Sequence, residues 1–294
     1  MPRFQRAHDD TIEVGEALAR QLVDDQFPEW AGLPLRRWEQ PGSDHVIYRL
    51  GDELSVRFPR HAGAIGQARK EMAWLPRLAP HLPLDIPAPV AVGEPALGYP
   101  WAWAATRWLP GVVATVDELG DSPAVARTLA SFVLALQGFP AVGEVSASRL
   151  ADRDRSTREA IRQVAGDFDA ERLLAVWEAA VDAPAWDRAP VWYHGDFHTG
   201  NLLTVDGRLS AVIDFGGLGY GDPAPDLMMA FSLMTPAARA EFRAELGVDD
   251  GTWARGRGHA LTGGVIAHRA YARTNPRVRA ATTRQLTAVL DIGS

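Results

Sequence analysis

Residues 191–226 read VWYHGDFHTGNLLTVDGRLSAVIDFGGLGYGDPAPD, and this stretch decides the fold. It holds two short apolar runs, and each run ends in polar residues that can act in phosphoryl chemistry. Asp196 and Asn201 follow the first run, and Asp214 follows the second. Each of these residues alone would be an ordinary turn residue. Their occurrence together at fixed offsets favours a functional site, because a motif counts only in its structural context.

A β-hairpin is predicted between the two runs. The Asp-Gly pair at 206–207 is typical of a tight turn, with strands expected at 202–205 and 209–213. We expect this hairpin to bring Asn201 and Asp214 to the same end, where the oxygens of both side chains could bind one divalent cation.

The spacing in this stretch is that of the catalytic loop of kinases. There, an aspartate positions the attacking hydroxyl, an asparagine five positions later binds magnesium, and an Asp-Phe-Gly aspartate binds the metal that bridges the phosphates. HGDFHTGN at 194–201 and IDFG at 213–216 resemble the aminoglycoside phosphotransferase family, which also includes macrolide and other small-molecule kinases. The resemblance implies that Asp196 is catalytic and that Asn201 and Asp214 bind Mg²⁺.

The same resemblance implies an α+β fold with two lobes, like that of protein kinases. A small β-rich lobe at 1–109 would bind the nucleotide, and a larger, mostly helical lobe at 110–294 would carry catalysis and bind the acceptor. ATP or GTP would donate its γ-phosphoryl group to a hydroxyl of a small molecule, with antibiotics as the first candidates. Protein substrates are not expected, because no long activation segment with an Ala-Pro-Glu motif follows Asp214.

Arg57 stands where kinases carry a strand lysine that contacts the α and β phosphates. Alternation in the strand expected at 54–58 places Arg57 on the opposite face from its apolar neighbours, towards the cleft. Glu71, on a helix expected at 62–78, is its predicted partner. An exposed arginine on an edge strand remains the alternative. The only lysine, Lys70, is expected to point away from Glu71.

Two further segments are predicted to contact the nucleotide. The turn with Gly42 and Ser43, between strands expected at 35–40 and 46–50, would cover the phosphates, although one glycine in a hairpin turn is commonly only a turn.

The other segment is the strand expected at 101–108. By the resemblance, this strand leads into the hinge between the lobes. Matching the Pro-Gly break at 110–111 then makes Thr106 the residue behind the purine, with Arg107 and Leu109 providing backbone contacts.

Apolar periodicity and end signals predict the remaining helices. Asp10 and Glu13 would form a capping box for a helix that runs to Phe27. The resemblance implies that the polar helical region at 152–182 forms one wall of the acceptor pocket. Asp226 is expected to brace the loop at His194. Further helices are expected at 124–137, 227–234, 237–246, 251–273 and 276–291.

Composition narrows the partners. The net charge of −7 argues against nucleic acid and is mildly favourable for a cationic substrate. From residue 251 onward, however, there are seven arginines and one acid, which argues against a strongly cationic aminoglycoside unless acids at 152–171 bind it. The chain has no cysteine, and no signal peptide or membrane span is apparent, so the cytosol is the expected compartment.

Two rival functions stay open at this point. A metabolic kinase would act on a sugar, amino alcohol or similar acceptor. A nucleotide-binding pseudoenzyme would retain the fold without turnover, and Arg57 in place of lysine is the only motif-level support for that interpretation.

Overall fold

The computed structural model describes residues 11–38, 44–140 and 149–291, and the chain divides into two compact units. The first unit comprises Met1–Pro80, Asp85–Pro110 and Ala211–Gly216, and the second comprises His81–Leu84, Gly111–Ser210 and Gly217–Ser294. Asp214 therefore belongs to the first unit, although the chain on both sides of its segment belongs to the second. Whether these units act as the nucleotide and acceptor lobes predicted at 1–109 and 110–294 stays a prediction.

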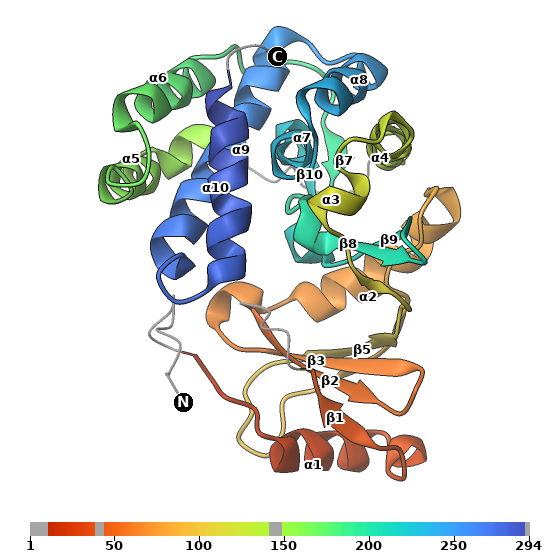
Figure 1. The fold of residues 1–294 in the computed structure, drawn as a ribbon. Coiled ribbons are helices and arrows are strands. Elements are labelled where there is room, and N and C mark those ends of the chain that lie inside the picture. The colour runs from red at the N-terminus through yellow and green to blue at the C-terminus, as the bar shows by residue number, and fades with distance from the viewer. Residues whose placement is uncertain (1–10, 39–43, 141–148, 292–294) are drawn as a thin grey trace. The chain divides into compact units, whose positions relative to one another are not determined.

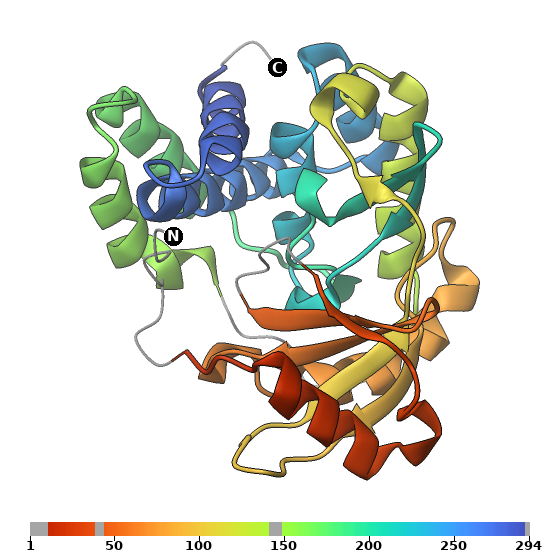
Figure 2. The ribbon, with the colours of Figure 1, turned by 60° about the horizontal axis from the view of Figure 1, so that its bottom comes forward.

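An antiparallel five-stranded sheet forms the first unit, in the order β1-β2-β3-β5-β4. Helices α1 and α2 lie on opposite faces of this sheet (Figure 1), and Figure 2 shows α1 running across the strands. The bounds are α1 (Glu16–Gln26), β1 (Leu35–Arg37), β2 (His45–Leu50), β3 (Leu54–Pro59), α2 (Gln67–Leu78), β4 (Pro89–Gly93) and β5 (Trp103–Arg107).

The alternation predicted for β3 is confirmed. Val56 and Phe58 are fully buried in one apolar cluster with Leu22 and Val23 of α1. Successive strand residues face opposite sides, so Arg57 points to the other face of the sheet. Because β3 lies between β2 and β5, Arg57 is not on an edge strand.

Two helix starts predicted from the sequence are wrong. The first helix begins at Glu16, and residues 11–15 form neither helix nor strand, because Ile12 donates its backbone N–H to Arg60 O and the Glu13 carboxylate pairs with Arg60 at 2.5 Å. Asp10 lies outside the described residues. The second helix, α2, begins at Gln67 because Gly66 before it adopts a left-handed φ of 87°, which ends the preceding turn.

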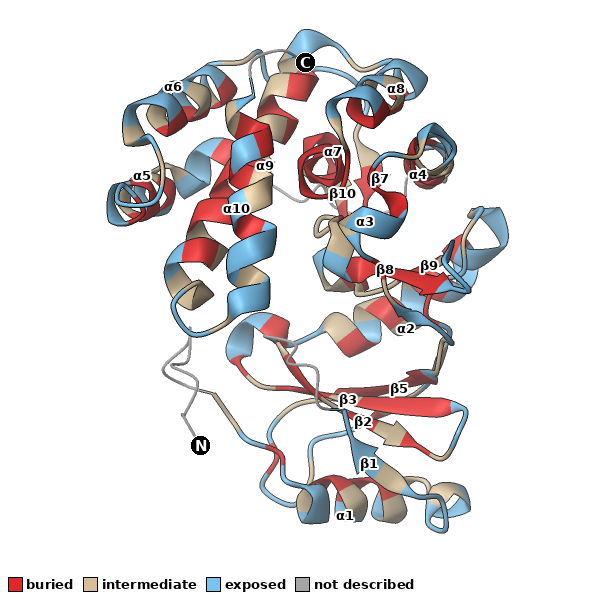
Figure 3. Ribbon diagram, viewed as in Figure 1, coloured by how far each residue is buried: buried red, intermediate tan, exposed pale blue. Residues whose placement is uncertain are grey.

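Helices dominate the second unit. They are α3 (Val116–Leu119), α4 (Pro123–Gln137), α5 (Asp154–Gln163), α6 (Ala170–Val181), α7 (Met228–Ser232), α8 (Pro236–Leu246), α9 (Asp250–Tyr271) and α10 (Pro276–Leu290). All residues of α7 are buried, as the burial colouring shows (Figure 3). The polar region expected as one helical stretch is divided into α5 and α6. No helix in the described ranges is long and apolar enough to span a membrane.

Short strands carry the polar motif. β7 (Val191–Tyr193) pairs with β10 (Gly219–Gly221), and β6 (Val112–Val113), β8 (Leu202–Val205) and β9 (Arg208–Val212) form a sheet in the order β6-β8-β9. The predicted hairpin is confirmed, and Asp206 and Gly207 at its turn have φ values of 50° and 71°. Short 3₁₀ turns are η1 (Pro28–Trp30), η2 (Ala62–Ala64), η3 (Ala79–His81), η4 (Leu150–Arg153), η5 (Thr199–Asn201), η6 (Phe215–Gly217) and η7 (Ala224–Leu227).

Candidate active site

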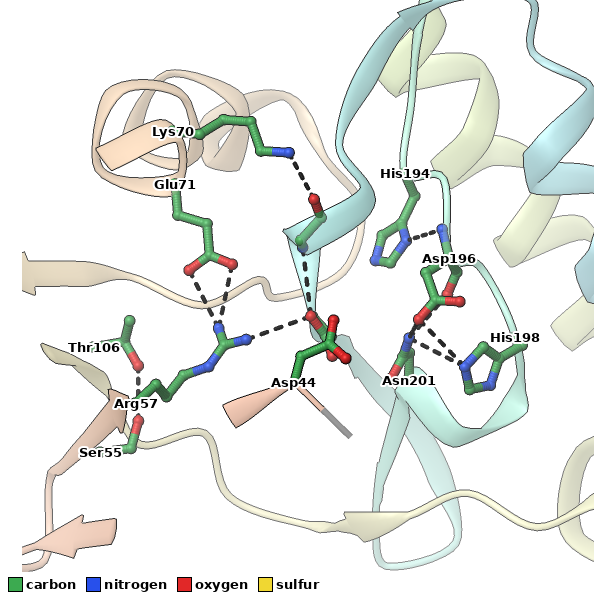
Figure 4. A network of polar contacts seen from close by, with 12 residues as sticks. Asp44, Ser55, Arg57, Lys70, Glu71, Thr106, His194, Asp196, His198 and Asn201 are labelled. Carbon is green, nitrogen blue, oxygen red and sulfur yellow. Dashed lines mark hydrogen bonds and ion pairs between the residues drawn. The ribbon is translucent and has the colours of Figure 1, made fainter. Parts of the chain in front are cut away.

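Arg57 joins two carboxylates in the first unit. Its Nη1 donates to both carboxylate oxygens of Glu71 at 3.2 Å, and its Nη2 donates to Oδ1 of Asp214 at 3.4 Å (Figure 4). Burial alone would lower the pKa of Arg57, but Glu71 and Asp214 together raise it, so the guanidinium stays charged. The predicted Arg57–Glu71 pair is thus formed. The fork of the guanidinium reaches both acids at once, which a single ammonium group could not do in the same way.

Asp214 has an uncommon backbone conformation for a residue other than glycine, with a φ of 63°. Its Oδ1 faces the guanidinium of Arg57 and the N–H of Gly216, the latter at 3.4 Å. Its Oδ2 forms no hydrogen bond or ion pair with the described residues. One carboxylate oxygen of Asp214 is therefore held by the protein while the other remains available to a ligand.

Lys70 does not point away from this cluster, so that expectation is wrong. Its Nζ donates to the carbonyl oxygen of Gly216 at 2.6 Å. Neighbouring helix positions do differ by about 100° in direction, but a four-carbon stem is long enough to bend back. The spacing of residues in a sequence predicts the direction in which a side chain leaves the helix. It does not predict where the end of a long, flexible side chain lies.

The predicted purine-binding residues lie at the end of β5. Thr106 is opposite Ser55 in the β3–β5 register, and their hydroxyls are 2.7 Å apart. This places Thr106 on the same face as Arg57. The N–H of Arg107 donates to Ala88 O, so it is not available to a base, whereas the N–H of Leu109 forms no hydrogen bond with the described residues.

Gly42 and Ser43 lie outside the described residues, so their predicted contact with phosphates stays a prediction. At the end of that segment, Asp44 Oδ1 lies 3.2 Å from Nε2 of His61. The N–H of Gly63 donates to Nδ1 of His61, which leaves the proton of a neutral ring on Nε2, facing Asp44. Sequence reasoning missed this contact because no motif links the two residues.

In the second unit, a tight turn after β7 positions the loop that carries Asp196. Gly195 has a φ of 83°, and a Cβ there would lie 2.2 Å from the carbonyl oxygen of Gly217, so no other residue fits without a shift. Asp226 accepts hydrogen bonds at 2.8 Å from the N–H groups of both His194 and Gly195. The bracing contact expected of Asp226 is therefore present.

Burial raises the pKa of Asp226 to about 7, and the negative charge of Asp196 adds to the rise, while the two backbone hydrogen bonds oppose it. Asp226 is almost fully buried, at 1% exposure.

Asp196 is fixed through one of its oxygens. Oδ2 accepts a hydrogen bond from Nδ2 of Asn201 at 3.0 Å and lies 3.5 Å from Nε2 of His198 (Figure 4). Oδ1 has no hydrogen-bond partner among the described residues, and the side chain is 49% exposed. Burial would raise the pKa of Asp196, but the His198 contact, the charges of His198 and His194 and the Asn201 bond lower it to about 2. The carboxylate is therefore ionised at neutral pH.

His198 was not assigned a role from the sequence. Its Nδ1 accepts the N–H of Gly200 at 3.0 Å, so the proton of a neutral ring is on Nε2 and faces Asp196. The sequence feature that could have pointed to this contact is that His198 lies only two residues after Asp196.

The residues present fit a magnesium ion by the chemistry of their donors. Asn201 uses both N–H groups of its amide on Asp196, which leaves its Oδ1 without a partner among the described residues. Asp214 offers its Oδ2 in the first unit, so each unit has one oxygen of the kind that magnesium binds. Magnesium bound with a nucleotide takes one or two protein oxygens and completes its shell with phosphates and water. The described residues contain no cluster of three or more histidine or acidic ligands.

Three of the seven arginines from residue 251 onward donate hydrogen bonds within the protein. Arg255 donates to Asp222 at 2.7 Å, Arg257 donates to Val289 O at 2.7 Å, and Arg284 donates to Ser232 O. The number of arginines in this region therefore overstates how many could face an acceptor.

Comparisons with known proteins give the family. Residues 35–261 match the model of the phosphotransferase enzyme family. An aminoglycoside 3'-phosphotransferase of Escherichia coli is 30% identical over 225 residues, which cover 70% of this chain and 80% of the relative. A relative of the same name from Salmonella typhimurium is 27% identical over 163 residues, or 51% of this chain and 60% of that protein.

Solved structures agree on the fold. The GDP complex of wild-type aminoglycoside 2'-phosphotransferase-IIIa superposes with a TM-score of 0.73 at 20% identity, covering 94% of this chain and 99% of that one. The apoenzyme of a macrolide 2'-phosphotransferase of Brachybacterium faecium gives 0.58 at 25% identity, covering 95% and 99%. The fold is the predicted α+β fold, kinase-like, with a small antiparallel sheet and a larger helical part, and the chain belongs to the phosphotransferase enzyme family.

Proposed function

We propose that this protein transfers the γ-phosphoryl group of ATP or GTP to a hydroxyl of a small antibiotic, with Asp196 as the catalytic residue. The observation that carries this proposal is the state of Asp196. One of its oxygens is fixed by Asn201, the other has no partner among the described residues, and a pKa of about 2 keeps it ionised. Such a carboxylate orients a hydroxyl and accepts its proton late in the transfer.

In this step the acceptor oxygen forms a bond to the γ-phosphorus, and the bond between that phosphorus and the leaving oxygen breaks. The nucleoside diphosphate leaves with the bonding electrons, and the acceptor proton goes to Oδ1 of Asp196. Arg57, held by Glu71, would bind the α and β phosphates. Asn201 and Asp214 would hold Mg²⁺, which neutralises charge on the phosphates.

An antibiotic acceptor is supported by the relatives. Those of similar sequence are named aminoglycoside 3'-phosphotransferases, and the solved structures of this fold include complexes with kanamycin, gentamicin and streptomycin, besides macrolide 2'-phosphotransferases. Charge does not select among these acceptors here, because acids of α5 and α6 are also engaged within the protein. Asp154, for example, accepts from Trp177 and Arg158.

The test is a coupled assay for release of ADP or GDP against panels of aminoglycosides, macrolides, sugars and amino alcohols. We expect turnover with at least one antibiotic, and Asp196→Ala should lower kcat by 10²-fold or more while nucleotide affinity stays within a few-fold. Turnover confined to sugars or amino alcohols would make this a metabolic kinase. Tight nucleotide binding without turnover of any acceptor would make it a pseudoenzyme.

A further inference from the structure

Helix α2 directs three side chains towards the Asp-Phe-Gly segment at 214–216. Gln67 lies three residues before Lys70 and four before Glu71, so it is the neighbour of each on the helix surface. Glu71 acts through Arg57, which bridges it to Asp214. The other two side chains reach the glycine that ends the segment.

Lys70 and Gln67 both lie near Gly216. Lys70 donates to its carbonyl oxygen at 2.6 Å (Figure 4). A Cβ added to Gly216 would lie 2.8 Å from the amide group of Gln67. Burial lowers the pKa of Lys70, while the carboxylates of Glu71 and Asp214 oppose this shift. The ammonium group therefore lies within the electrostatic range of both acids.

The segment needs such an anchor. Asp214 adopts a φ of 63°, a region that is strained for any residue with a Cβ and persists only when surrounding contacts enforce it. The hydrogen bonds to Asp214 itself are both 3.4 Å long, so they constrain it weakly. The contact of Lys70 with Gly216, two residues further on, is much shorter.

We propose that Lys70 is a positioning residue for the magnesium ligand. By holding the carbonyl of Gly216, it maintains the conformation in which Oδ2 of Asp214 has no partner among the described residues and is available to the metal. This inference rests on the proposed function only in taking magnesium as the ligand of Asp214. The alternative is that Lys70 takes the part of the missing strand lysine and binds a phosphate directly.

The test uses Lys70→Met, which keeps length but removes the donor, and Lys70→Arg, which keeps a charged donor. Arg69→Met is the matched control, because Arg69 is the neighbouring residue on α2 and pairs at the surface with Glu94. Calorimetry measures the Kd of ATP for each protein, once with Mg²⁺ and once with EDTA. The ratio of the two Kd values reports how well the protein uses the metal.

We expect Lys70→Met to raise the Kd of Mg-ATP about tenfold, within the range of a lost charged hydrogen bond, while the Kd in EDTA stays within about twofold. Lys70→Arg should restore much of the ratio, and Arg69→Met should match the parent. An equal loss with and without Mg²⁺ would assign Lys70 to phosphate binding instead. Parent-like values for Lys70→Met would also overturn the proposal.

Hydrogen exchange of the free protein gives a readout that needs no nucleotide. Amides in a peptide covering 209–218 should exchange faster in Lys70→Met than in the parent or Arg69→Met, and Lys70→Arg should recover protection. Unchanged exchange in Lys70→Met contradicts the anchoring role. If the parent binds no nucleotide, the proposed function fails, and this exchange measurement still decides whether Lys70 holds the segment.

Discussion

At the scale of single residues, the buried carboxylate of Glu71 depends on one positively charged partner, Arg57. Glu71 is 2% exposed, so its carboxylate requires the guanidinium of Arg57 beside it. A buried pair of this kind is costly to break, because removing one partner leaves the other charge uncompensated. Arg57 therefore has a structural role beside Glu71, in addition to the phosphate contact proposed for it.

Arg57→Lys separates these two consequences. A lysine keeps the positive charge near Glu71, so the fold should survive, but it cannot donate in two directions as Arg57 does to Glu71 and Asp214. We expect a higher nucleotide KM and a lower kcat, corresponding to about 1.5–3 kcal/mol for a weakened charged contact. Steady-state kinetics check this.

The comparison variant is Arg57→Ala, which should also unfold more easily, by about 3–5 kcal/mol, because Glu71 is left unpaired. Kinetics of Arg57→Lys equal to the parent would show that the guanidinium fork is not needed, and that charge alone suffices.

Asp226 gives a prediction that depends on pH. Its pKa is raised to about 7 by burial, whereas an unfolded aspartate has a pKa near 3.9. Since the folded state holds the proton more tightly, the stability due to Asp226 is greatest below about pH 4 and is lost as pH rises through about 7. Asp226→Asn does not titrate, so its destabilisation relative to the parent should be largest at low pH and shrink towards pH 8.

Urea unfolding of both proteins between pH 5 and 8 measures this difference, and titration of other groups cancels in the comparison. A destabilisation by Asp226→Asn that grows with pH would contradict this prediction. It would mean that the two backbone hydrogen bonds outweigh burial and that Asp226 is ionised throughout this pH range.

At the scale of elements, the sequence predicted correctly those features of secondary structure that depend on neighbouring residues. The Asp-Gly turn between β8 and β9 and the alternation along β3 were predicted because each depends on a few neighbouring residues. The start of α1 and the direction of Lys70 were not. Both depend on residues distant in sequence, Arg60 in the first case and Gly216 in the second. The motif identified Asp196 and Asn201 as candidate site residues, but the hydrogen bond between them and the contact with His198 could be seen only in the structure.

Gly195→Ala tests the turn that carries the catalytic loop. The methyl group of the alanine would lie 2.2 Å from the carbonyl oxygen of Gly217. The alanine would also have to adopt the φ of 83° that Gly195 has, which is strained for a residue with a Cβ. Gly207→Ala is the matched control, since it also has positive φ, at 71°, but open space around it. We expect about 1 kcal/mol of destabilisation for the control from strain alone, and clearly more for Gly195→Ala.

Activity should separate the two variants further. Gly195→Ala should lose most turnover, because its turn leads directly into Asp196, while Gly207→Ala should retain parent-like kcat. Denaturant unfolding and kinetics on the same preparations provide both values. Equal effects of the two substitutions would show that the clash with Gly217 is relieved at little cost.

At the scale of the whole molecule, the residues predicted to bind the nucleotide, the metal and the acceptor belong to two compact units. Arg57, Glu71 and Asp214 belong to the first, and Asp196 and Asn201 belong to the second. The segment Ala211–Gly216 belongs to the first unit, although the residues on either side belong to the second. Binding of a ligand to the folded chain raises its free energy of unfolding, so thermal unfolding can test which residues hold that ligand.

Mg-nucleotide provides this test. A ligand at 100 times its Kd stabilises the folded state by about 2.7 kcal/mol, so Mg-ATP or Mg-GTP should raise the Tm of the parent by several degrees. Asp214→Asn replaces the charged side chain that is proposed to bind the metal by a neutral one. If its Kd rises tenfold, the stabilisation falls by about 1.4 kcal/mol at the same ligand concentration. Its shift with EDTA present should equal that of the parent, because the metal is then absent from both.

Asp196→Ala should keep the full Mg-dependent shift, since Asp196 is proposed to contact the acceptor and not the metal. A full Mg-dependent shift in Asp214→Asn would mean that this residue only shapes its loop, and a lost shift in Asp196→Ala would move Asp196 from the acceptor side to the metal.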